Sequence, residues 1–168
     1  TDELPRVNEQ MRSLAIFEDL IILNTDDAHI IAIDARTGQV RWDTPTAAEG
    51  RPRRFTSGPI VANGVIIAGQ ASCRADQGGC DLVGLDGRTG RELWRTSTVP
   101  QPGEPGGDTW GGLPMESRAG GEPWMSGTYD PDTGLVFWGT AQAKPWARGA
   151  RDTGDGVELY TNSTLALD

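Results

Sequence analysis

Three of the six tryptophans lie in loops that are rich in glycine and proline, namely Trp110, Trp124 and Trp146. In such a loop an indole can offer its flat face to a planar ligand, because small neighbours leave room for the ligand to approach. Packing into hydrophobic gaps between sheets is the alternative role for the same side chains. We expect packing for Trp110 and Trp146, and the residues alone leave both roles open for Trp124.

The two cysteines, Cys73 and Cys80, are the other candidates for chemistry, in the segment "CRADQGGC". A structural metal site would need four ligands at closer spacing, and the single histidine lies far away in the sequence. A disulfide that closes a small loop is the better interpretation, with free thiols as the alternative. A disulfide would imply an oxidising compartment.

The composition favours short strands and tight turns over long helices. The chain has 168 residues, of which 36% are hydrophobic, with 23 glycines and 11 prolines. Its net charge of −9 argues against a nucleic-acid partner, because binding to phosphates requires a basic surface. No run of about eighteen apolar residues is present, so no membrane span is expected. The polar start shows no signal-peptide pattern, so either a leader has been removed or the chain is an internal piece.

A nine-residue pattern occurs three times: "DARTGQVRW" at 34–42, "DGRTGRELW" at 86–94 and "DPDTGLVFW" at 130–138. Asp, Thr, Gly and Trp have the same offsets in each copy. Apolar runs flank each Asp-x-x-Thr-Gly segment, which predicts a strand, a turn and a second strand. The aspartate can accept backbone hydrogen bonds in the turn, and the glycine supplies a positive φ. A fourth copy would begin at the final "LALD".

The strand and turn patterns along the chain predict an all-β fold. Residues 14–25 predict two strands around a Glu-Asp turn, and residues 58–69 predict a hairpin at Asn63-Gly64. No window keeps the helical period for three turns. The aspartates of successive copies, including the final one, are 52, 44 and 38 residues apart, which suits propeller blades of four strands. We therefore predict a partial β-propeller of about three four-stranded blades. An open sandwich with coincidental turns is the alternative.

One tryptophan per blade would have a packing role in this propeller. The three tryptophans of the repeat are Trp42, Trp94 and Trp138. Each indole would lie at an equivalent place between blades and pack its face on the neighbouring blade.

The segment "GGEPWMSGTYDPDTGLVFWGTAQAKPW" at 120–146 resembles the signature region of the pyrroloquinoline quinone (PQQ) dependent alcohol dehydrogenases, the quinoprotein methanol and ethanol dehydrogenase group. The segments "RSLAI", "TSGPIVANGVIIAG" and "DLVGLDGRTGRELWRTST" resemble neighbouring parts of that family in the right order. The resemblance covers essentially the whole chain. It implies an eight-bladed propeller with tryptophan-docking motifs. Residues 1–168 would form an incomplete part of it, ending at the start of a further motif.

The resemblance also implies cofactor-binding residues. PQQ is a planar ortho-quinone with three carboxylates, so it needs an aromatic face, cationic and hydroxyl donors, and a divalent ion at its reactive carbonyl. Trp124 matches the tryptophan that forms the floor under the quinone, Arg12 an arginine at its side, and Thr56 a threonine that binds a carboxylate. Ser72 falls near a cofactor-binding serine, with Ala71 as the competing alignment.

The calcium ligands are where the sequence departs from the family. Gln142 stands at the position of an asparagine ligand and keeps an amide oxygen. The glutamate ligand of the family falls near Arg74, where no glutamate exists, and Asp76 is the substitute candidate. The adjacent cysteines that cover the quinone in many relatives are missing. The pair Cys73 and Cys80 would either do a comparable job from another loop or pin that loop.

The implied function is that of a periplasmic dehydrogenase segment. The whole enzyme would oxidise an alcohol by hydride transfer to PQQ, with Ca²⁺ as Lewis acid, and pass electrons to a c-type cytochrome. The catalytic aspartate of the family lies beyond this chain, so we assign no catalytic residue here. We expect the chain to need the remaining blades and to be inactive alone. A non-catalytic scaffold with the same repeats is the alternative, but it would have no reason to keep the candidate cofactor and metal residues, which are Arg12, Thr56, Trp124 and Gln142.

Overall fold

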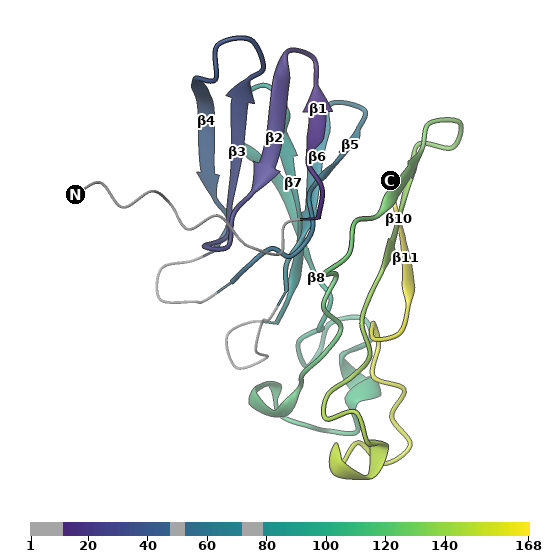
Figure 1. The fold of residues 1–168 in the computed structure, drawn as a ribbon. Helices are drawn as coiled ribbons and strands as arrows, with labels where there is room; N and C mark the ends of the chain where they lie inside the picture. Colours follow the sequence, from purple (N-terminus) through teal and green to yellow (C-terminus); the bar gives the residue numbers. More distant parts are fainter. Residues whose placement is uncertain (1–11, 48–52, 72–78) are drawn as a thin grey trace, which may run out of the picture.

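Three antiparallel β-sheets follow one another along the chain (Figure 1). The computed structural model describes residues 12–47, 53–71 and 79–168. The first sheet contains, in spatial order, β1 (Ala15–Phe17), β2 (Leu20–Asn24), β3 (His29–Asp34) and β4 (Val40–Pro45). The second contains β5 (Ile60–Ala62), β6 (Val65–Gly69), β7 (Asp81–Asp86) and β8 (Glu92–Ser97). The third contains β9 (Thr128–Asp130), β10 (Leu135–Gly139) and β11 (Thr164–Leu167), in the order β11-β10-β9.

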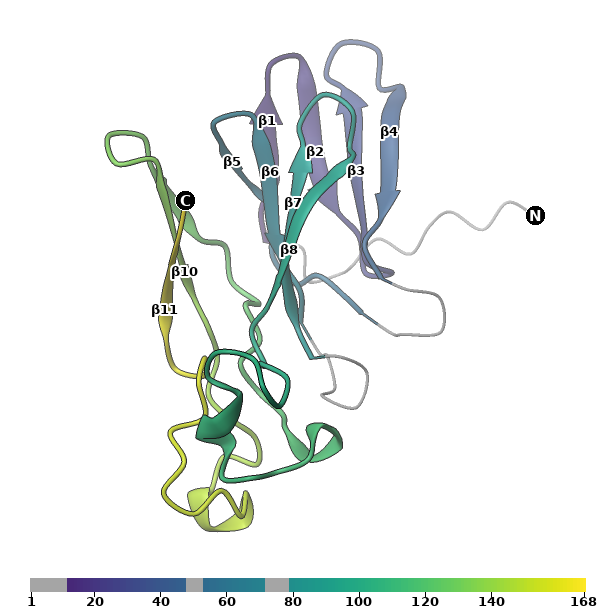
Figure 2. The same cartoon turned by 180° about the vertical axis from the view of Figure 1, so that it is seen from behind.

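Long irregular segments connect the second sheet to the third and β10 to β11. They lie together below the third sheet in Figures 1 and 2. They contain three short 3-10 helices, η2 (Gly107–Trp110), η3 (Met115–Ser117) and η4 (Arg148–Ala150). No helix in the described ranges is long and apolar enough to span a bilayer. The all-β prediction is therefore confirmed.

The sheets stand face to face, and the middle one has a hydrophobic core on each side. Alternate residues of a strand point to opposite faces. In β6, Ile66 and Ala68 therefore belong to the core shared with the first sheet, whereas Ile67 belongs to the core shared with the third. In β7, Val83 and Leu82 divide in the same way. This double burial explains why "VIIAG" is apolar throughout instead of alternating. Successive sheets packed in this manner are the arrangement of neighbouring propeller blades.

The expected hairpin turns are present. Asn63 and Gly64 both have positive φ, 46° and 83°, between the paired residues Ala62 and Val65. Positive φ at both central residues is the type I′ geometry that matches strand twist. The Glu-Asp turn between β1 and β2 is likewise confirmed, with Glu18 at φ 55°.

The aspartates of the repeat form the predicted turns. Asp34 accepts the backbone N–H groups of Arg36 and Thr37 at 3.0 and 2.8 Å. Asp86 accepts both the backbone N–H and the hydroxyl of Thr89 at 2.8 Å. These hydrogen bonds favour the ionised carboxylate and hold the pKa of both aspartates below the ordinary value.

The third copy of the repeat differs from the other two, so our expectation of three equivalent tryptophans is wrong. The first two copies connect the third and fourth strands of their sheets, whereas Asp130 to Trp138 connects β9 to β10, the first two strands of the third sheet. The turn chemistry is local and suits any antiparallel pair, so the motif does not specify which pair it joins. The true counterpart of Asp34 and Asp86 is Asp168, which follows the third strand, β11.

Trp42 and Trp94 do occupy equivalent places. Trp42 lies opposite Ala32 and Trp94 opposite Gly84, and each pair adjoins a shift in strand register. The Trp42 indole donates to the carbonyl of Gly87, at 3.2 Å, and so docks on the turn of the next sheet. Trp94 faces the third sheet and lines a cavity together with residues that include Asp168.

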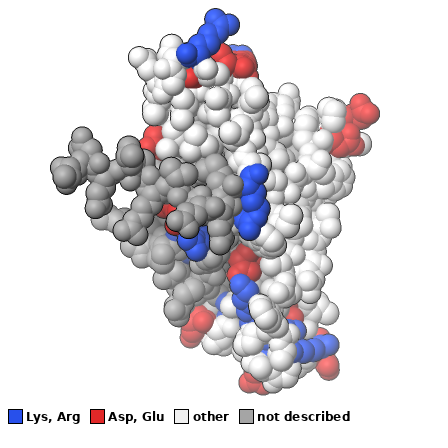
Figure 3. Space-filling model, in the orientation of Figure 1, with Lys and Arg blue, Asp and Glu red and all other residues white. Residues whose placement is uncertain are grey.

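Charged groups on the surface are interspersed. Most of the described part of the face shown in Figure 3 carries neither acidic nor basic side chains. Its described part shows no continuous band of Lys and Arg, in keeping with the net charge of −9.

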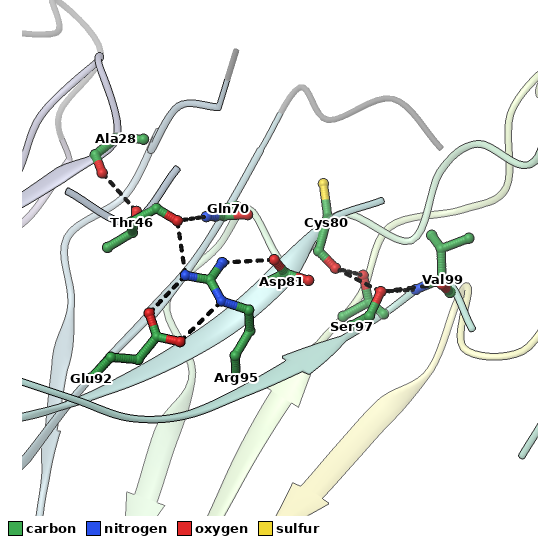
Figure 4. A network of polar contacts seen from close by, with 10 residues as sticks. Ala28, Thr46, Gln70, Cys80, Asp81, Glu92, Arg95, Ser97 and Val99 are labelled. Carbon is green, nitrogen blue, oxygen red and sulfur yellow. Dashed lines mark hydrogen bonds and ion pairs between the residues drawn. The ribbon is translucent and has the colours of Figure 1, made fainter. Parts of the chain in front are cut away.

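A polar network joins the first two sheets at the end near the irregular segments (Figure 4). The Arg95 guanidinium donates to Asp81 at 2.8 Å and to the carbonyl of Thr46, beyond β4, at 2.9 Å. The same carbonyl accepts the side-chain amide of Gln70 at 3.3 Å. Burial raises the pKa of Asp81, although the hydrogen bond from Arg95 opposes the shift. Arg95 therefore adds a charged connection between the first two sheets, in addition to the hydrogen bond from Trp42 to Gly87.

Replacing Gly90 by Ala tests the docking of Trp42. Gly90 has φ 71°, and a Cβ atom there would lie 2.6 Å from the Trp42 ring. Gly38 occupies the same turn position with φ 73° and has open space around it, so Gly38→Ala is the matched control. We expect Gly38→Ala to cost about 1–2 kcal/mol through the left-handed backbone alone. Gly90→Ala should cost at least about 1 kcal/mol more because of overpacking. Equal shifts in denaturant midpoint for the two variants would show that Trp42 does not dock there.

Replacing Asp86 by Asn tests the turn carboxylates. Because the folded pKa is lowered, ionised Asp86 stabilises the fold above the unfolded pKa of about 3.9 and this contribution is lost as the pH falls through the folded value. We expect Asp86→Asn to be less stable than the parent at pH 7, with the difference shrinking below about pH 4. Thermal melts of both proteins from pH 7 down to below about pH 4 measure this difference. A difference that stays constant with pH would contradict the assignment.

Candidate functional site

A pocket of about 360 Å³ lies where the ends of the sheets meet the irregular segments. This volume falls within the range of about 300–1,000 Å³ that is common for small-molecule sites. Five separate segments of the chain contribute to it. Its lining residues are Arg12, Thr56, Ala71, Glu122, Trp124, Ala141, Gln142, Lys144 and Trp146. The structure thus brings together four residues that the sequence predicted, Arg12, Thr56, Trp124 and Gln142.

Trp124 is held through its backbone, which leaves its ring available. Its carbonyl accepts the hydroxyls of Thr56 and Ser57 at 3.1 and 2.9 Å. The Arg12 guanidinium lies 5.6 Å from the centre of the ring and donates to the Thr56 carbonyl at 2.5 Å. The Trp124 side chain remains 37% exposed. A fixed, partly uncovered indole beside a cation is suited to a flat, anionic ligand.

The Trp124 segment crosses very close to β6. The carbonyl of Pro123 accepts the Trp138 indole N–H at 3.0 Å. A Cβ atom on Gly69 would lie 1.9 Å from that same carbonyl oxygen, so only glycine permits the crossing. Trp138 is fully buried between the second and third sheets. The core therefore fixes the position of the residue next to Trp124.

A short antiparallel contact forms another part of the pocket wall. Gly120 pairs with Ala143, and the Ala141 N–H donates to the Glu122 carbonyl at 3.0 Å. A Cβ atom on Gly120 would lie 2.3 Å from the Gln142 carbonyl, which explains the glycine at this point. This pairing brings Gln142, exposed at the rim, next to the Trp124 segment.

Sequence reasoning missed an ion pair in this wall. The carboxylate of Glu122 is nearly buried, and Lys144 Nζ lies 2.5 Å from its Oε1 atom. Composition could have drawn attention to Lys144, because it is the only lysine of the chain.

The described residues fit the chemistry of PQQ. Trp124 offers an aromatic face and Arg12 a cation, as the resemblance implied. The Thr56 hydroxyl gives its proton to the Trp124 carbonyl in this structure, so it must rotate to donate to a cofactor carboxylate. Ser57 would still satisfy the Trp124 carbonyl after such a rotation.

The described residues do not by themselves fit a calcium ion. Within them, no group of three or more His, Cys, Asp or Glu side chains could hold a metal. Gln142 offers one amide oxygen, and the carboxylate of Glu122 is already paired with Lys144. Asp76 lies outside the described residues, so its predicted role as a ligand stays a prediction.

Two other predictions also concern residues outside the described ranges. Ser72 is not described, whereas its competitor Ala71 does line the pocket. Cys73 is not described either, so the disulfide with the buried Cys80 stays a prediction.

The remaining two loop tryptophans have different environments. Trp110 is 1% exposed, donates to the Leu159 carbonyl at 2.6 Å and lies under the Arg118 guanidinium. It is therefore a packing residue, but it packs among the irregular segments and belongs to neither core between the sheets. Trp146 is 74% exposed at the rim of the pocket, so packing between sheets is not its role within the described chain. The Gly120–Ala143 contact brings the Trp146 segment to the pocket, and nothing in the sequence pointed to that contact.

Residues 47–168 match the PQQ family described as the β-propeller domain of glucose, ethanol and alcohol dehydrogenases. The quinohemoprotein alcohol dehydrogenase ADH IIB of Pseudomonas putida is 33% identical over 93% of the chain and 24% of its own length. The dehydrogenase subunit of a quinone-linked alcohol dehydrogenase of Gluconobacter oxydans is 31% identical over 94% and 23%. The crystal structure of the quinohemoprotein alcohol dehydrogenase of Comamonas testosteroni superimposes with a TM-score of 0.81, at 29% identity, over 94% of the chain and 25% of that structure.

These matches confirm the prediction of a partial propeller. The chain spans about a quarter of the length of the curated relatives it matches.

Replacing Trp124 by Ala tests the stacking role. Because the ring is partly exposed and its backbone is held independently, we expect only a small loss of thermal stability. PQQ affinity should fall by roughly tenfold or more, from a lost face contact of about 1 kcal/mol in addition to lost area. Trp110→Ala is the control and should cost about 3–5 kcal/mol of stability, because that ring is fully buried. The measurements are quinone titration and thermal unfolding of the natural protein that carries this chain. Normal quinone binding together with early unfolding in Trp124→Ala would make Trp124 a packing residue.

Proposed function

The chain belongs to the PQQ family of glucose, ethanol and alcohol dehydrogenase β-propeller domains, and we propose that it forms part of the cofactor site of an enzyme that oxidises an alcohol by hydride transfer to PQQ. The observation that carries this proposal is the pocket itself. Arg12, Thr56 and Trp124 come from three distant segments and meet around one cavity of about 360 Å³. The resemblance had assigned all three to the cofactor.

Each of these residues would have a definite part in binding. Trp124 would support one face of the planar ring system, with its own backbone fixed by Thr56 and Ser57. Arg12 would place its positive charge beside the quinone; in the structure its guanidinium lies over the Trp124 ring, 5.6 Å from the ring centre. When bound, PQQ supplies the two-electron acceptor for the hydride of the alcohol. The residues of this chain would orient that acceptor and offset its negative charge.

Further parts of the proposal concern the rest of the enzyme. We include a calcium ion as Lewis acid, whose ligands would come mainly from outside the described residues, with Gln142 as one contributor. A c-type cytochrome as the next electron acceptor and a periplasmic location complete it. The general base that takes the alcohol proton would come from another blade, so the chain alone would bind without turning over substrate.

A non-catalytic propeller scaffold is the competing function. The structure offers it no specific support, because blade packing uses Trp42, Trp94 and Trp138 and leaves Trp124 outside the cores. A scaffold would not need a partly uncovered indole beside an arginine.

Reconstitution of the natural protein with PQQ tests the proposal. We expect saturable quenching of tryptophan fluorescence by PQQ and, in the loaded protein, reduction of an artificial electron acceptor when an alcohol is added. Arg12→Gln should weaken PQQ binding by about tenfold, as expected for the loss of a charged hydrogen bond. Arg36→Gln, in the first repeat turn and outside the pocket, is the control and should bind normally. A protein that binds no PQQ would favour the scaffold.

A further inference from the structure

Lys144 is an unusual residue for this chain. Of the 15 basic residues, fourteen are arginines and Lys144 is the single lysine. It lines the same pocket as Trp124 and Arg12. Its side chain is 43% exposed, whereas that of its partner Glu122 is only 6% exposed. The ammonium group is therefore accessible at the pocket wall, where it could either stabilise the fold or bind a ligand.

The ion pair is not needed to hold the two segments together. The backbone already joins them, because Gly120 pairs with Ala143 and the Lys144 N–H donates to the Ala119 carbonyl at 2.9 Å. A half-exposed ion pair adds little to stability, whereas the near burial of Glu122 carries a desolvation cost. Stability alone therefore does not explain the pair.

The hydrogen-bonding capacity of Lys144 points to a ligand. An ammonium group has three N–H donors and no acceptor. One of them is directed to Glu122 Oε1, at 2.5 Å, and within the described ranges the others meet no further acceptor. The Glu122 carboxylate fixes the position of the ammonium while leaving donors for an anionic oxygen in the pocket.

We propose that Lys144 is a second cationic anchor of the pocket, which donates to a carboxylate of the bound quinone, and that Glu122 is its positioning residue. The inference rests on the proposed function, because it takes the tricarboxylate PQQ as the ligand. Arg12 and Lys144 reach the pocket from different segments of the chain, so the two cations could bind different parts of one anionic ligand.

The two partners of this ion pair should have opposite effects on binding. Removing the charge of Lys144 removes an anchor, so Lys144→Met should weaken PQQ binding by about tenfold or more. Glu122→Gln keeps an amide oxygen for Lys144 but removes a negative charge from the pocket wall. That variant should bind PQQ more tightly by a few-fold. A purely structural ion pair would instead make both variants worse in the same direction.

The experiment is PQQ titration, followed by tryptophan fluorescence quenching, on the natural protein and its variants, each with a thermal melt. Lys144→Arg keeps the charge and should retain most of the affinity. Arg148→Gln removes a positive charge from the same loop but outside the pocket, so it should leave affinity unchanged. Unchanged affinity in Lys144→Met, or equal weakening in Lys144→Met and Glu122→Gln with lower melting temperatures, would overturn the inference while the proposed function stands. No PQQ binding by the parent protein would overturn the proposed function itself.

Amine labelling gives a second readout that does not depend on a variant folding. Acetic anhydride should acetylate Lys144, and PQQ should protect it at saturating concentration. Cleavage by trypsin after Arg118 and Arg148 yields a peptide with Lys144 as its one lysine, so mass spectrometry reports this site alone. Labelling that PQQ does not slow, in protein shown to bind PQQ, would count against Lys144 as an anchor.

Discussion

The close crossing of the Trp124 segment over β6 is the constraint on which the pocket depends. The Pro123 carbonyl sits where Gly69 has no side chain and accepts the indole N–H of the buried Trp138. The crossing thus anchors the backbone beside Trp124 to the core between the second and third sheets. With that backbone fixed, the hydroxyls of Thr56 and Ser57 can hold the Trp124 carbonyl. The Trp124 ring, which we propose binds the quinone, is therefore supported by core packing without being part of it.

The middle sheet also has two structural roles. The middle sheet sends alternate residues into two cores, so its strands are apolar on both faces and position the first and third sheets at once. Trp42 adds a directional contact, because its indole reaches the turn that begins at Asp86 in the next sheet. The candidate site lies at one end of these sheets, where a rigid scaffold brings together residues from distant parts of the chain.

The carboxylates differ in their surroundings, and the direction of their pKa shifts differs accordingly. Asp34 and Asp86 cap exposed turns, and the hydrogen bonds they accept lower their pKa. Asp81 lies in a network between two sheets, where burial raises its pKa despite the contact with Arg95. Glu122 lies in the pocket wall and pairs with Lys144, the only lysine of the chain. Our proposal for Lys144 follows from this last arrangement, in which backbone pairing alone already holds the wall.

The sequence by itself determined the local features of this protein. The Asp-x-x-Thr-Gly turns, the Asn63-Gly64 hairpin and the all-β class follow from preferences that act within a few residues, and the resemblance pointed to Trp124 and Arg12. Only the tertiary structure decided which strands each turn joins, and so it placed Trp138 on β10 and not on a fourth strand. It also brought Lys144 to Glu122 across 22 residues, through the Gly120–Ala143 pairing. The physical reason is that turn chemistry is local, whereas strand pairing and close backbone crossings depend on segments that meet only after the sheets have packed.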